Sequence, residues 1–391
     1  MKIALVCDWY RPRIGGIEQH LEGLAQRLTH AGHDVVVITP TRGDPVVNDV
    51  RVHRIDAPLA PHFKFLRSAS GIRAIGDALE HERVDVAHSH VSIVSPAAIG
   101  GALEAERRGI PSVVTFHSVV PRTVWLAHAM RVSLRTAEWT ARFSAVSARV
   151  AREIAPAAGG RTVSILPNGI DAAFWRRDAI VHEPDADATN ATNAKPTLAA
   201  FSVMRLNAKK RPLALVGIMS RLVDRLGEAA RITLRIAGDG PQRGALQRAI
   251  GRAGLAGSIQ LLGRCTHEEI RNELHEADVF LLPTIRESFG LAALEARCAG
   301  VPVVAMAQSG VAEVIEHGRD GLLGSTDAEL AEHLATLATN HALRAAIARH
   351  NACTPTMFDW PRVIDAHERI YREATALRAN MRTTVRAERN A

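Results

Sequence analysis

Short apolar runs alternate with helical patterns along this chain, and the alternation occurs in two separate stretches. The first stretch opens with the apolar run Lys2–Cys7, after which apolar residues recur at helical spacing from Ile17 to Leu28. The second stretch opens with Thr197–Val203, and a helical pattern follows over Pro212–Leu226. Parallel strands need long crossover connections, which are usually helices. The order therefore predicts an α/β chain with two Rossmann-like, doubly wound halves.

The other elements continue this pattern and set the expected domain boundaries. Residues 176–196 lack periodicity and are rich in Asp, Asn, Thr and Ala, which indicates a linker. We therefore expect an N-terminal domain over residues 1–175, a C-terminal domain over 197–358, and a final helix with a basic tail over 359–391. Further strands are expected at Val35–Thr39, Arg51–Ile55, Asp85–His90, Ser112–His117, Arg231–Ala237, Ile259–Leu262, Asp278–Pro283 and Pro302–Ala305, and further helices at Ile72–Glu82, Pro96–Arg108, Gln242–Ala253, His267–Glu276, Phe289–Ala299 and Pro361–Leu377.

Composition narrows the class of protein. The length of 391 residues suits two domains of roughly 150–200 residues each. A net charge of +7 suits acidic small molecules, anionic membranes or nucleic acid, but only 4% of the residues are aromatic, which argues against base-stacking surfaces. The four cysteines form no CxxC pair, so neither a disulfide framework nor a zinc ribbon is expected. Apolar runs are too short for a signal peptide or a membrane span, and we expect a cytoplasmic protein.

The segment Glu287–Glu295 carries the strongest chemical signal. It follows an apolar strand, and Ser288 is expected to cap the helix that starts there. Free amides at a helix start form an anion site together with the helix dipole. Because carboxylates repel phosphate, Glu287 and Glu295 are better placed to accept hydrogen bonds from sugar hydroxyls, although both acids can instead merely complement the helix dipole. The amides expected to point out of the helix are those of Phe289, Gly290 and Leu291.

A basic turn follows the first strand of the second half. Arg205 and Lys210 lie five residues apart where the strand ends, and they can converge on one diphosphate. Ligands of open α/β sheets bind at this edge. The alternative is a solvated basic turn without a ligand.

Two features of the first half are weaker signals. Gly15 and Gly16 lie between the first strand and the first helix, where glycines permit a ligand to approach the backbone, although ordinary turns also use this pair. Neither this segment nor Gly238–Gly244 is a full GxGxxG fingerprint, so a nicotinamide cofactor is not indicated. Histidines at strand ends invite a metal site, but the ligand set is incomplete, and packing is the ordinary explanation for His20, His88 and His90.

Taken together, these residues resemble the retaining glycosyltransferases of family GT4, which have the GT-B fold. The resemblance runs from Met1 to about Ala376. The segments Gly15–His20 and His88–His90 are similar to the branch that contains the N-acetylglucosaminyl-phosphatidylinositol synthesis proteins. The fold implied is two Rossmann-like domains facing across a cleft, with a C-terminal helix crossing back to the N-terminal domain. The motifs that carry the resemblance are Gly15-Gly16, Phe116-His117, Pro167–Asp171, Arg205 with Lys210, Gly238–Gly240, and Glu287 with Glu295.

The resemblance also implies roles for these positions. The amide of Gly16 and the side chains of Arg205 and Lys210 are expected to hold the donor diphosphate. Glu295 is expected to bind the ribose and Glu287 the transferred sugar. The chain departs from the family pattern at Arg211, where glycine is common, and this puts the placement of Lys210 in question. Further expected site residues are His117 over the reacting sugar, the amides of Phe289, Gly290 and Leu291 at the diphosphate, and Gly15, Gly240 and Arg264 in the donor site; Ser309-Gly310 replaces a frequent Gly-Gly pair.

The expected reaction follows from the charge that develops. Breaking a sugar–diphosphate bond places negative charge on the leaving phosphate, which Arg205, Lys210 and the helix-start amides can stabilise. No metal or other cofactor is then required, and a UDP- or GDP-sugar is the expected donor. The resemblance implies retention of configuration, with the leaving phosphate taking the proton of the acceptor.

The acceptor is less defined by the sequence. A hydroxyl of a glycan or of a lipid-linked acceptor is expected, and nucleic acid is not. The segment Phe63–Arg67 and the arginines Arg378, Arg382, Arg386 and Arg389 can contact an anionic membrane, or they can be a packed loop and a solvated tail. Two other functions stay open at this point: a sugar-nucleotide epimerase of the same fold, and a basic binding protein that is not an enzyme.

Overall fold

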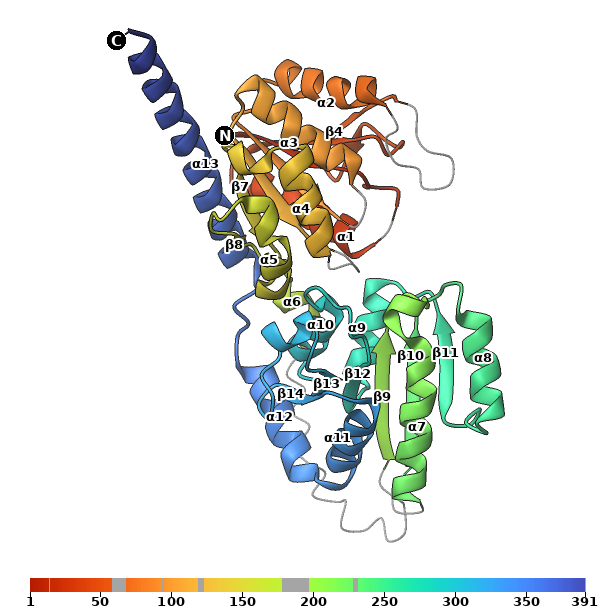
Figure 1. The fold of residues 1–391 in the computed structure, drawn as a ribbon. Helices are drawn as coiled ribbons and strands as arrows, with labels where there is room; N and C mark the ends of the chain where they lie inside the picture. Colours follow the sequence, from red (N-terminus) through yellow and green to blue (C-terminus); the bar gives the residue numbers. More distant parts are fainter. Residues whose placement is uncertain are drawn as a thin grey trace. The chain divides into compact units, whose positions relative to one another are not determined.

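A computed structural model describes residues 1–13, 15–57, 68–92, 95–118, 123–177, 197–227 and 231–390. The chain divides into two compact units (Figure 1). Unit 1 comprises Met1–Gly169 and Phe358–Ala391, and unit 2 comprises Ile170–Met357. The first unit therefore ends before the boundary expected at residue 175. The reason is the short helix α6 (Ala172–Trp175), whose Trp175 carbonyl oxygen hydrogen-bonds to His275 of unit 2 over 3.0 Å. Most of the expected linker lies outside the described residues.

Unit 1 contains one sheet whose strands run in the order β3-β4-β2-β1-β5-β6-β7-β8. All neighbours are parallel except β3 and β4, so the expectation of a doubly wound parallel sheet is confirmed for this unit. The strand order reverses direction between β1 and β5, which makes this position the topological switch point of the sheet. The strands are β1 (Lys2–Cys7), β2 (Asp34–Thr39), β3 (Val46–Val47), β4 (Val50–Arg54), β5 (Val86–Val91), β6 (Ser112–Phe116), β7 (Arg142–Ala145) and β8 (Ser164–Ile165).

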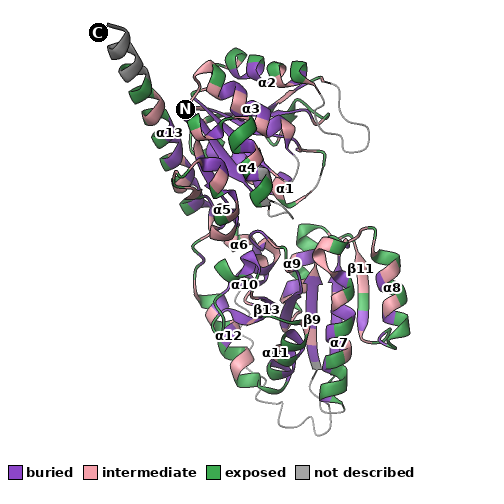
Figure 2. Cartoon of the chain, in the orientation of Figure 1, coloured by how far each residue is buried: buried purple, intermediate pink, exposed green. Residues whose placement is uncertain are grey.

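Helices cover this sheet, and its inner strands β1, β2, β5 and β6 are almost fully buried, whereas the edge strands β3 and β8 are not (Figure 2). Ser68 caps α2 by accepting a hydrogen bond from the amide of Gly71, and Gly109 ends α3 in a left-handed conformation. The sequence pattern missed α4, which has 11 residues, and α5, which has seven. The helices of unit 1 are α1 (Gly16–His30), α2 (Ala69–His81), α3 (Pro96–Arg108), α4 (Thr123–Ser133), α5 (Ala148–Ile154) and α13 (Trp360–Asn390), with 3₁₀ turns at Thr136–Glu138 and Ala155–Ala158.

Unit 2 is a second parallel sheet with the order β11-β10-β9-β12-β13-β14. This order reverses between β9 and β12, as in a nucleotide-binding Rossmann sheet. The strands are β9 (Thr197–Val203), β10 (Arg231–Ala237), β11 (Ile259–Gly263), β12 (Val279–Leu282), β13 (Val303–Met306) and β14 (Gly321–Gly324). Apart from α6, the helices are α7 (Pro212–Leu226), α8 (Arg243–Arg252), α9 (His267–His275), α10 (Leu291–Cys298), α11 (Asp327–Thr339) and α12 (His341–Cys353), with 3₁₀ turns at Ala208–Lys210 and Gly310–Glu313.

The C-terminal helix α13 returns to unit 1, as expected. Its residues Val363, Ile370 and Tyr371 are buried in the same apolar core as strand β1. The helix extends beyond the expected end at Leu377. Arg378 is not a solvated tail residue, because its guanidinium donates hydrogen bonds to Glu106 Oε1 (3.0 Å) and Thr140 Oγ1 (2.8 Å). The side chains of Arg382, Arg386 and Arg389 lie outside the described residues, as does the segment Phe63–Arg67.

Trp360 anchors the start of α13 in unit 1. Its indole stacks on the ring of His20, with a centroid separation of 5.5 Å and an interplanar angle of 11°. The guanidinium carbon of Arg27 also lies over the Trp360 ring, 4.7 Å from its centroid. A Cβ atom on Gly169 would lie 2.4 Å from the indole, and one on Gly23 would lie 2.6 Å from it. The glycine of the Pro167–Asp171 motif therefore makes room for the residue that holds α13.

Substitution of Gly169 by alanine is expected to destabilise unit 1. The added methyl group would overlap the Trp360 indole, and such overpacking typically costs about 1–3 kcal/mol. Urea unfolding followed by tryptophan fluorescence measures this loss. Gly16→Ala is the matched control in the same unit, because nothing lies within 4 Å of its added Cβ. Equal stability of the two variants would contradict the packing role of Gly169.

No helix within the described part of the chain combines the length and the apolar character that a membrane span requires.

Candidate functional site

The switch point of unit 2 brings two predicted segments to one edge of the sheet. Strands β9 and β12 are neighbours, with Ala200 paired to Val279. The basic turn Met204–Arg211 follows β9, and the loop Pro283–Gly290 follows β12. Because both strands are parallel, both loops leave from their carboxyl ends, where ligands of such sheets bind.

Lys210 and Glu287 form an ion pair across these two loops. Lys210 Nζ donates a hydrogen bond to Glu287 Oε2 over 2.5 Å, and both side chains stay partly exposed. The backbone supports this contact, because Thr284 Oγ1 donates to the carbonyl oxygen of Lys210 over 3.2 Å. Asn207 caps the turn by accepting a hydrogen bond from the Lys210 amide. The two residues for which we expected separate partners, phosphate and sugar, therefore form an ion pair with each other.

Arg211 stands where glycine is common in the family, and the basic turn nevertheless keeps its conformation. Its backbone is left-handed, with φ 57° and ψ 46°, a conformation that favours glycine. Its side chain offsets that cost by donating to the carbonyl oxygen of Pro283 (2.8 Å) and to Asp327 Oδ2 (2.7 Å). Arg211 thus ties the basic turn to the loop that carries Glu287, and it supports the position of Lys210.

The start of α10 differs from the expectation. The helix begins at Leu291, its N-cap is Gly290, and no side chain caps it, so the prediction that Ser288 is the N-cap is wrong. Gly290 has φ 100°, and a Cβ there would lie 2.7 Å from Val311. Only glycine fits this turn without strain. The helix therefore begins two residues later than a Ser288 cap would require, at Leu291 instead of Phe289.

Ser309 and Gly310 pack against this loop from the next strand. The amide of Gly310 donates to the carbonyl oxygen of Glu287 over 2.8 Å. A Cβ on Gly310 would lie 2.3 Å from the carbonyl oxygen of Ser288, so this glycine is required for the close approach. Ser309 caps the short 3₁₀ turn by accepting from the amide of Val311. The replacement of the first glycine by Ser309 therefore leaves the essential contact intact.

Glu295 lies one helical turn beyond the start of α10 and is partly buried. Burial raises the pKa of its carboxyl from 4.5 to about 7. A carboxyl group with such a pKa changes its charge near neutral pH, which is common at functional sites.

The raised pKa predicts how Glu295 affects stability. Because its folded-state pKa lies above the unfolded value, the carboxyl contributes a loss of stability as the pH rises from about 4.5 to about 7. Glu295→Gln is therefore expected to raise the thermal midpoint relative to the native protein at pH 8 and to leave it almost unchanged at pH 5. Glu268→Gln, at an exposed position of unit 2, is the control and should show no such pH dependence. If Glu295→Gln changed the thermal midpoint by the same amount at pH 8 as at pH 5, as is expected of Glu268→Gln, this account would be contradicted.

The Gly238–Gly240 segment holds the loop that carries Arg205. A Cβ on Gly238 would lie 1.9 Å from the carbonyl oxygen of Met204, so only glycine allows this approach. The amide of Leu206 donates to the carbonyl oxygen of Asp239 over 3.0 Å. Arg205 therefore projects, exposed, from a loop fixed on both sides. Asp239 Oδ1 accepts a hydrogen bond from the amide of Gly240 (2.8 Å), and Asp239 Oδ2 forms an ion pair with the exposed Arg264 (3.3 Å).

The first helix of unit 1 starts at the switch point between β1 and β5. Gly15 is its extended N-cap and Gly16 its first residue. Glu18 is buried at this helix start and pairs with Arg13 over 3.0 Å. A Cβ on Gly15 would lie 2.4 Å from Glu18 Oε2, so the carboxylate occupies the space beside the helix start. Binding of a phosphate by the Gly16 amide stays a prediction.

A cluster of buried histidines lies at the same edge of unit 1. His117 follows β6 and is 5% exposed. Burial is the main cause that lowers its pKa to about 3, so the ring is neutral at physiological pH. Its Nε2 shares a hydrogen bond of 2.9 Å with His90 Nδ1. In the described residues, no group of three or more His, Cys, Asp or Glu side chains has the arrangement of a metal site. The members of the cluster are His20, His88, His90, His117 and His367.

Comparison with known proteins decides the family. Residues 14–174 match the family described as Glycosyltransferase Family 4, and residues 185–352 match glycosyl transferases group 1. The chain is 30% identical to a glycogen synthase of Mycobacterium tuberculosis over 412 residues, covering 95% of this chain and 94% of the relative. The chain is a group 1 glycosyltransferase.

Other relatives of this glycosyltransferase are consistent with that assignment. The GPI3 subunit of phosphatidylinositol N-acetylglucosaminyltransferase from Saccharomyces cerevisiae is 27% identical over 332 residues, covering 80% of this chain and 69% of the relative. A human protein named as part of the same transferase is 25% identical, covering 94% and 75%. Among solved structures, Anabaena HepE in complex with UDP and glucose has a TM-score of 0.74 at 20% identity, covering 94% of this chain and 98% of HepE. The lipopolysaccharide glycosyltransferase WaaG has a TM-score of 0.68 at 17% identity, with 93% and 99% covered. These likenesses confirm the GT-B fold.

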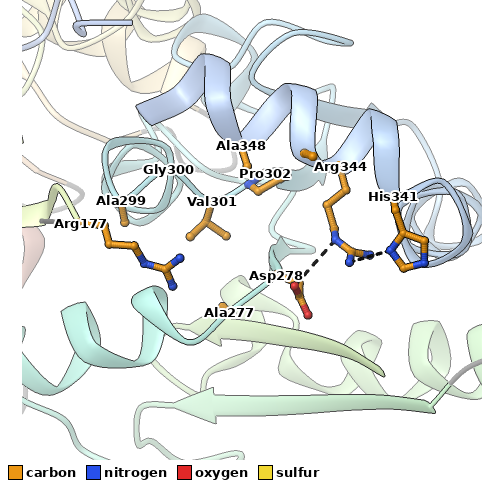
Figure 3. A pocket seen from close by; sticks show the side chains of 11 residues that line it. Arg177, Ala277, Asp278, Ala299, Gly300, Val301, Pro302, His341, Arg344 and Ala348 are labelled. Carbon is orange, nitrogen blue, oxygen red and sulfur yellow. Dashed lines mark hydrogen bonds and ion pairs between the residues drawn. The ribbon is translucent and has the colours of Figure 1, made fainter. Parts of the chain in front are cut away.

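Unit 2 of the glycosyltransferase contains a pocket of about 270 Å³ (Figure 3). Its lining includes Asp278 and Pro302, which directly precede strands β12 and β13. The pocket therefore opens at the amino ends of the strands, opposite the edge that carries Glu287. Arg344 is engaged there with Asp278 (3.8 Å) and His341 (3.0 Å), and it serves the packing of α12. None of the predicted site residues lines it.

The glycosyltransferase fold thus groups the predicted residues by unit. Unit 2 brings together Lys210 and Glu287 directly, with Arg211 as a support that the sequence marked only as a departure from the pattern. In unit 1 the sequence did not predict the hydrogen bond between His117 and His90. The signal available in the sequence was the spacing of His88 and His90, which places both rings on one face of a strand.

Proposed function

We propose that this glycosyltransferase moves a hexose or an N-acetylhexosamine from a UDP- or GDP-sugar to a hydroxyl group of a glycan or lipid-linked acceptor. The observation that carries the proposal is the meeting of Lys210 and Glu287 at the switch point of unit 2, beside the exposed Arg205. A cation and a carboxylate held at one point suit a ligand with both a diphosphate and a sugar. Membership of this family favours transfer over the epimerase and the non-enzymatic alternatives.

In the proposed mechanism the cations act on the leaving group. Arg205, Lys210 and the first amides of α10 bind the diphosphate, and Lys210 exchanges its bond to Glu287 for one to phosphate. The Glu287 carboxylate then accepts hydrogen bonds from the hydroxyls of the transferred sugar. The acceptor oxygen attacks the anomeric carbon as the bond to phosphate breaks, and the leaving phosphate oxygen takes the acceptor proton. Attack on the face from which phosphate departs retains the configuration, and no catalytic metal is needed.

The neutral His117 suits this reaction. Positive charge develops at the anomeric carbon, and an imidazolium beside it would oppose that charge. Burial keeps the pKa of His117 at about 3, so the ring offers hydrogen bonds without charge. Its proposed role is to contact the transferred sugar.

A lipid-linked acceptor at the cytoplasmic membrane surface is the acceptor we propose. Two of the relatives are named for transfer of N-acetylglucosamine to phosphatidylinositol. Support also comes from α4, on which Trp125 is 67% and Val132 is 77% exposed, next to the exposed Arg131. Exposed apolar and basic residues on one helix suit contact with an anionic lipid surface.

The first test is a thermal-shift screen with UDP, GDP, UDP-sugars and GDP-sugars. A ligand at a hundred times its dissociation constant adds about 2.7 kcal/mol of stability. Products with the stabilising sugar are then analysed with and without phosphatidylinositol vesicles or glycans. Glycosylated acceptor supports the proposal, whereas an isomeric nucleotide sugar without acceptor supports epimerisation. If no nucleotide sugar stabilises the protein, or Arg205→Ala keeps the full affinity for the stabilising nucleotide, the donor site is wrong.

A further inference from the structure

Asp327 is the first residue of helix α11, but the start of this helix does not depend on it. Thr326 is the N-cap and accepts a hydrogen bond from the amide of Glu329 over 3.1 Å. The Glu329 carboxylate accepts one from the amide of Ser325 over 2.9 Å, and its charge already suits the helix dipole. The Asp327 carboxylate bonds elsewhere, because its Oδ2 accepts a hydrogen bond from Arg211 Nη2 over 2.7 Å.

The other carboxylate oxygen of Asp327 shows that packing does not explain the residue. Asp327 Oδ1 is buried, and within the described part of the chain it has no hydrogen-bond partner. A buried polar atom without a partner destabilises the folded state, and alanine at this position would avoid that cost. The ion pair with Arg211 is therefore the feature that distinguishes an aspartate here.

Arg211 is held at two points of its guanidinium group. Nη1 donates to the carbonyl oxygen of Pro283 over 2.8 Å, and Nη2 donates to Asp327. Because the guanidinium group is planar and rigid, bonds to two of its nitrogens fix its orientation. The backbone of Arg211 lies in the left-handed region (φ 57°), which a residue other than glycine keeps only where its surroundings impose it. Asp327 and Pro283 supply such surroundings.

The orientation of Arg211 bears directly on Lys210. The two residues share a planar peptide bond, so a rotation of Arg211 displaces the carbonyl group of Lys210. That carbonyl oxygen accepts a hydrogen bond from Thr284 Oγ1 over 3.2 Å, in the loop that also carries Glu287. A chain of contacts thus runs from α11 through Arg211 to the lysine, and all of its members lie in unit 2.

We propose that Asp327 is a positioning residue, which fixes Arg211 and thereby holds the Lys210 ammonium group where it binds the donor diphosphate. This rests on the proposed function, because it assumes that Lys210 contacts the diphosphate. Asp327 itself touches no substrate. Misplacement of a binding group by about 1 Å can lower a rate about a hundredfold, so loss of Asp327 is expected to cost far more than loss of an ordinary surface ion pair.

Asp327→Ala and Glu332→Ala form a matched pair of variants. Arg211 is the N-cap of α7, and a second ion pair, between Arg225 of α7 and Glu332 of α11 (2.7 Å), connects the same two helices. Asp327→Ala is expected to lower kcat about 10–100-fold. Glu332→Ala should keep kcat within about twofold of native, and both variants should keep the native urea-unfolding midpoint, because partly exposed ion pairs contribute little to stability.

A double variant separates positioning from a general effect on the fold. If Asp327 acts through Lys210, adding Asp327→Ala to Lys210→Met lowers kcat no further, because the group that Asp327 positions is already absent. Initial rates at saturating nucleotide sugar measure both steps. A merely structural role of Asp327 would lower kcat by the same factor whether or not Lys210 is present.

The outcomes are distinguishable. A native kcat for Asp327→Ala overturns the proposal, as do equal losses in Asp327→Ala and Glu332→Ala or a further loss in the double variant. If Asp327→Ala does not fold, Asp327→Ser is measured in the same way, since serine suits a helix start but is too short to reach Arg211. If the native enzyme transfers sugar but Lys210→Met is fully active, the assumed diphosphate contact fails and the proposal fails with it. If the native enzyme transfers from no nucleotide sugar, the proposed function itself is wrong.

Discussion

Lys210→Met is expected to lower kcat for sugar transfer by at least a hundredfold. The lysine lies at the switch point of unit 2, where the leaving diphosphate gains negative charge as the sugar bond breaks. A preorganised group aimed at such charge contributes about 2.7–4 kcal/mol to the transition state. Its position is fixed by the Asn207 cap and by the bonds that Thr284 and Arg211 make across the two loops. Initial rates at saturating nucleotide sugar measure the loss.

Lys209→Met is the matched control for this variant. It removes the same charge from the same 3₁₀ turn (Ala208–Lys210), but the bond to Glu287 belongs to Lys210. The control is expected to keep kcat within about tenfold of native. In Lys210→Met itself, loss of the ion pair with Glu287 should shift the unfolding midpoint little, since partly exposed pairs contribute about 0–1 kcal/mol. Equal losses of kcat in both variants would show that only the net charge of the turn matters.

Much of the fold follows from local pattern. The expected bounds of Lys2–Cys7, Pro96–Arg108, Thr197–Val203 and Pro212–Leu226 agree with the structure. Two of these segments are short apolar runs, and the other two are helices that start with proline, whose fixed φ suits a helix start. Weakly periodic or short segments were missed, among them α4, α5 and β14.

The site could be predicted only as far as single positions. Which residues follow a strand can be read from the sequence, because parallel strands place their carboxyl ends at one edge. The pairing of Lys210 with Glu287, 77 residues apart, depends on β9 and β12 being neighbours, and this comes from the order of the sheet. The Ser288 cap failed because the turn at Gly290 is left-handed, a detail that no spacing encodes.

The histidine cluster shows a different limit of sequence reasoning. His88 and His90 look like ordinary packed residues as long as the distant helix α13 is ignored. Tyr371 of α13 bonds to His88, and His367 of the same helix lies 5.6 Å from the His88 ring, centroid to centroid. Only the return of the chain's last helix to its first sheet completes the network. Contacts between segments so far apart in the sequence produce no local periodicity from which they could be predicted.

Glu287→Gln is expected to lower kcat by at least a hundredfold while leaving the affinity for the free nucleotide diphosphate unchanged or higher. The amide keeps the shape of the side chain but loses the charge that accepts hydrogen bonds from sugar hydroxyls, and hydrogen bonds to charged groups contribute about 1.5–3 kcal/mol each. Lys210 loses the charged partner of its ion pair with Glu287, so it binds phosphate more readily. Isothermal titration with UDP or GDP and initial transfer rates separate the two effects.

The double variant Lys210→Met with Glu287→Gln gives the sharper result. Residues in direct contact show coupling, so the combined loss of kcat should be smaller than the product of the two single losses. A nucleotide affinity that falls in Glu287→Gln as far as in Lys210→Met would mean that the carboxylate only orients the lysine. In that case the sugar is recognised elsewhere, and Glu287 would belong with the supports of the basic turn, as Arg211 does. Independent losses that multiply would instead mean that the ion pair is not exchanged for phosphate and sugar during the reaction.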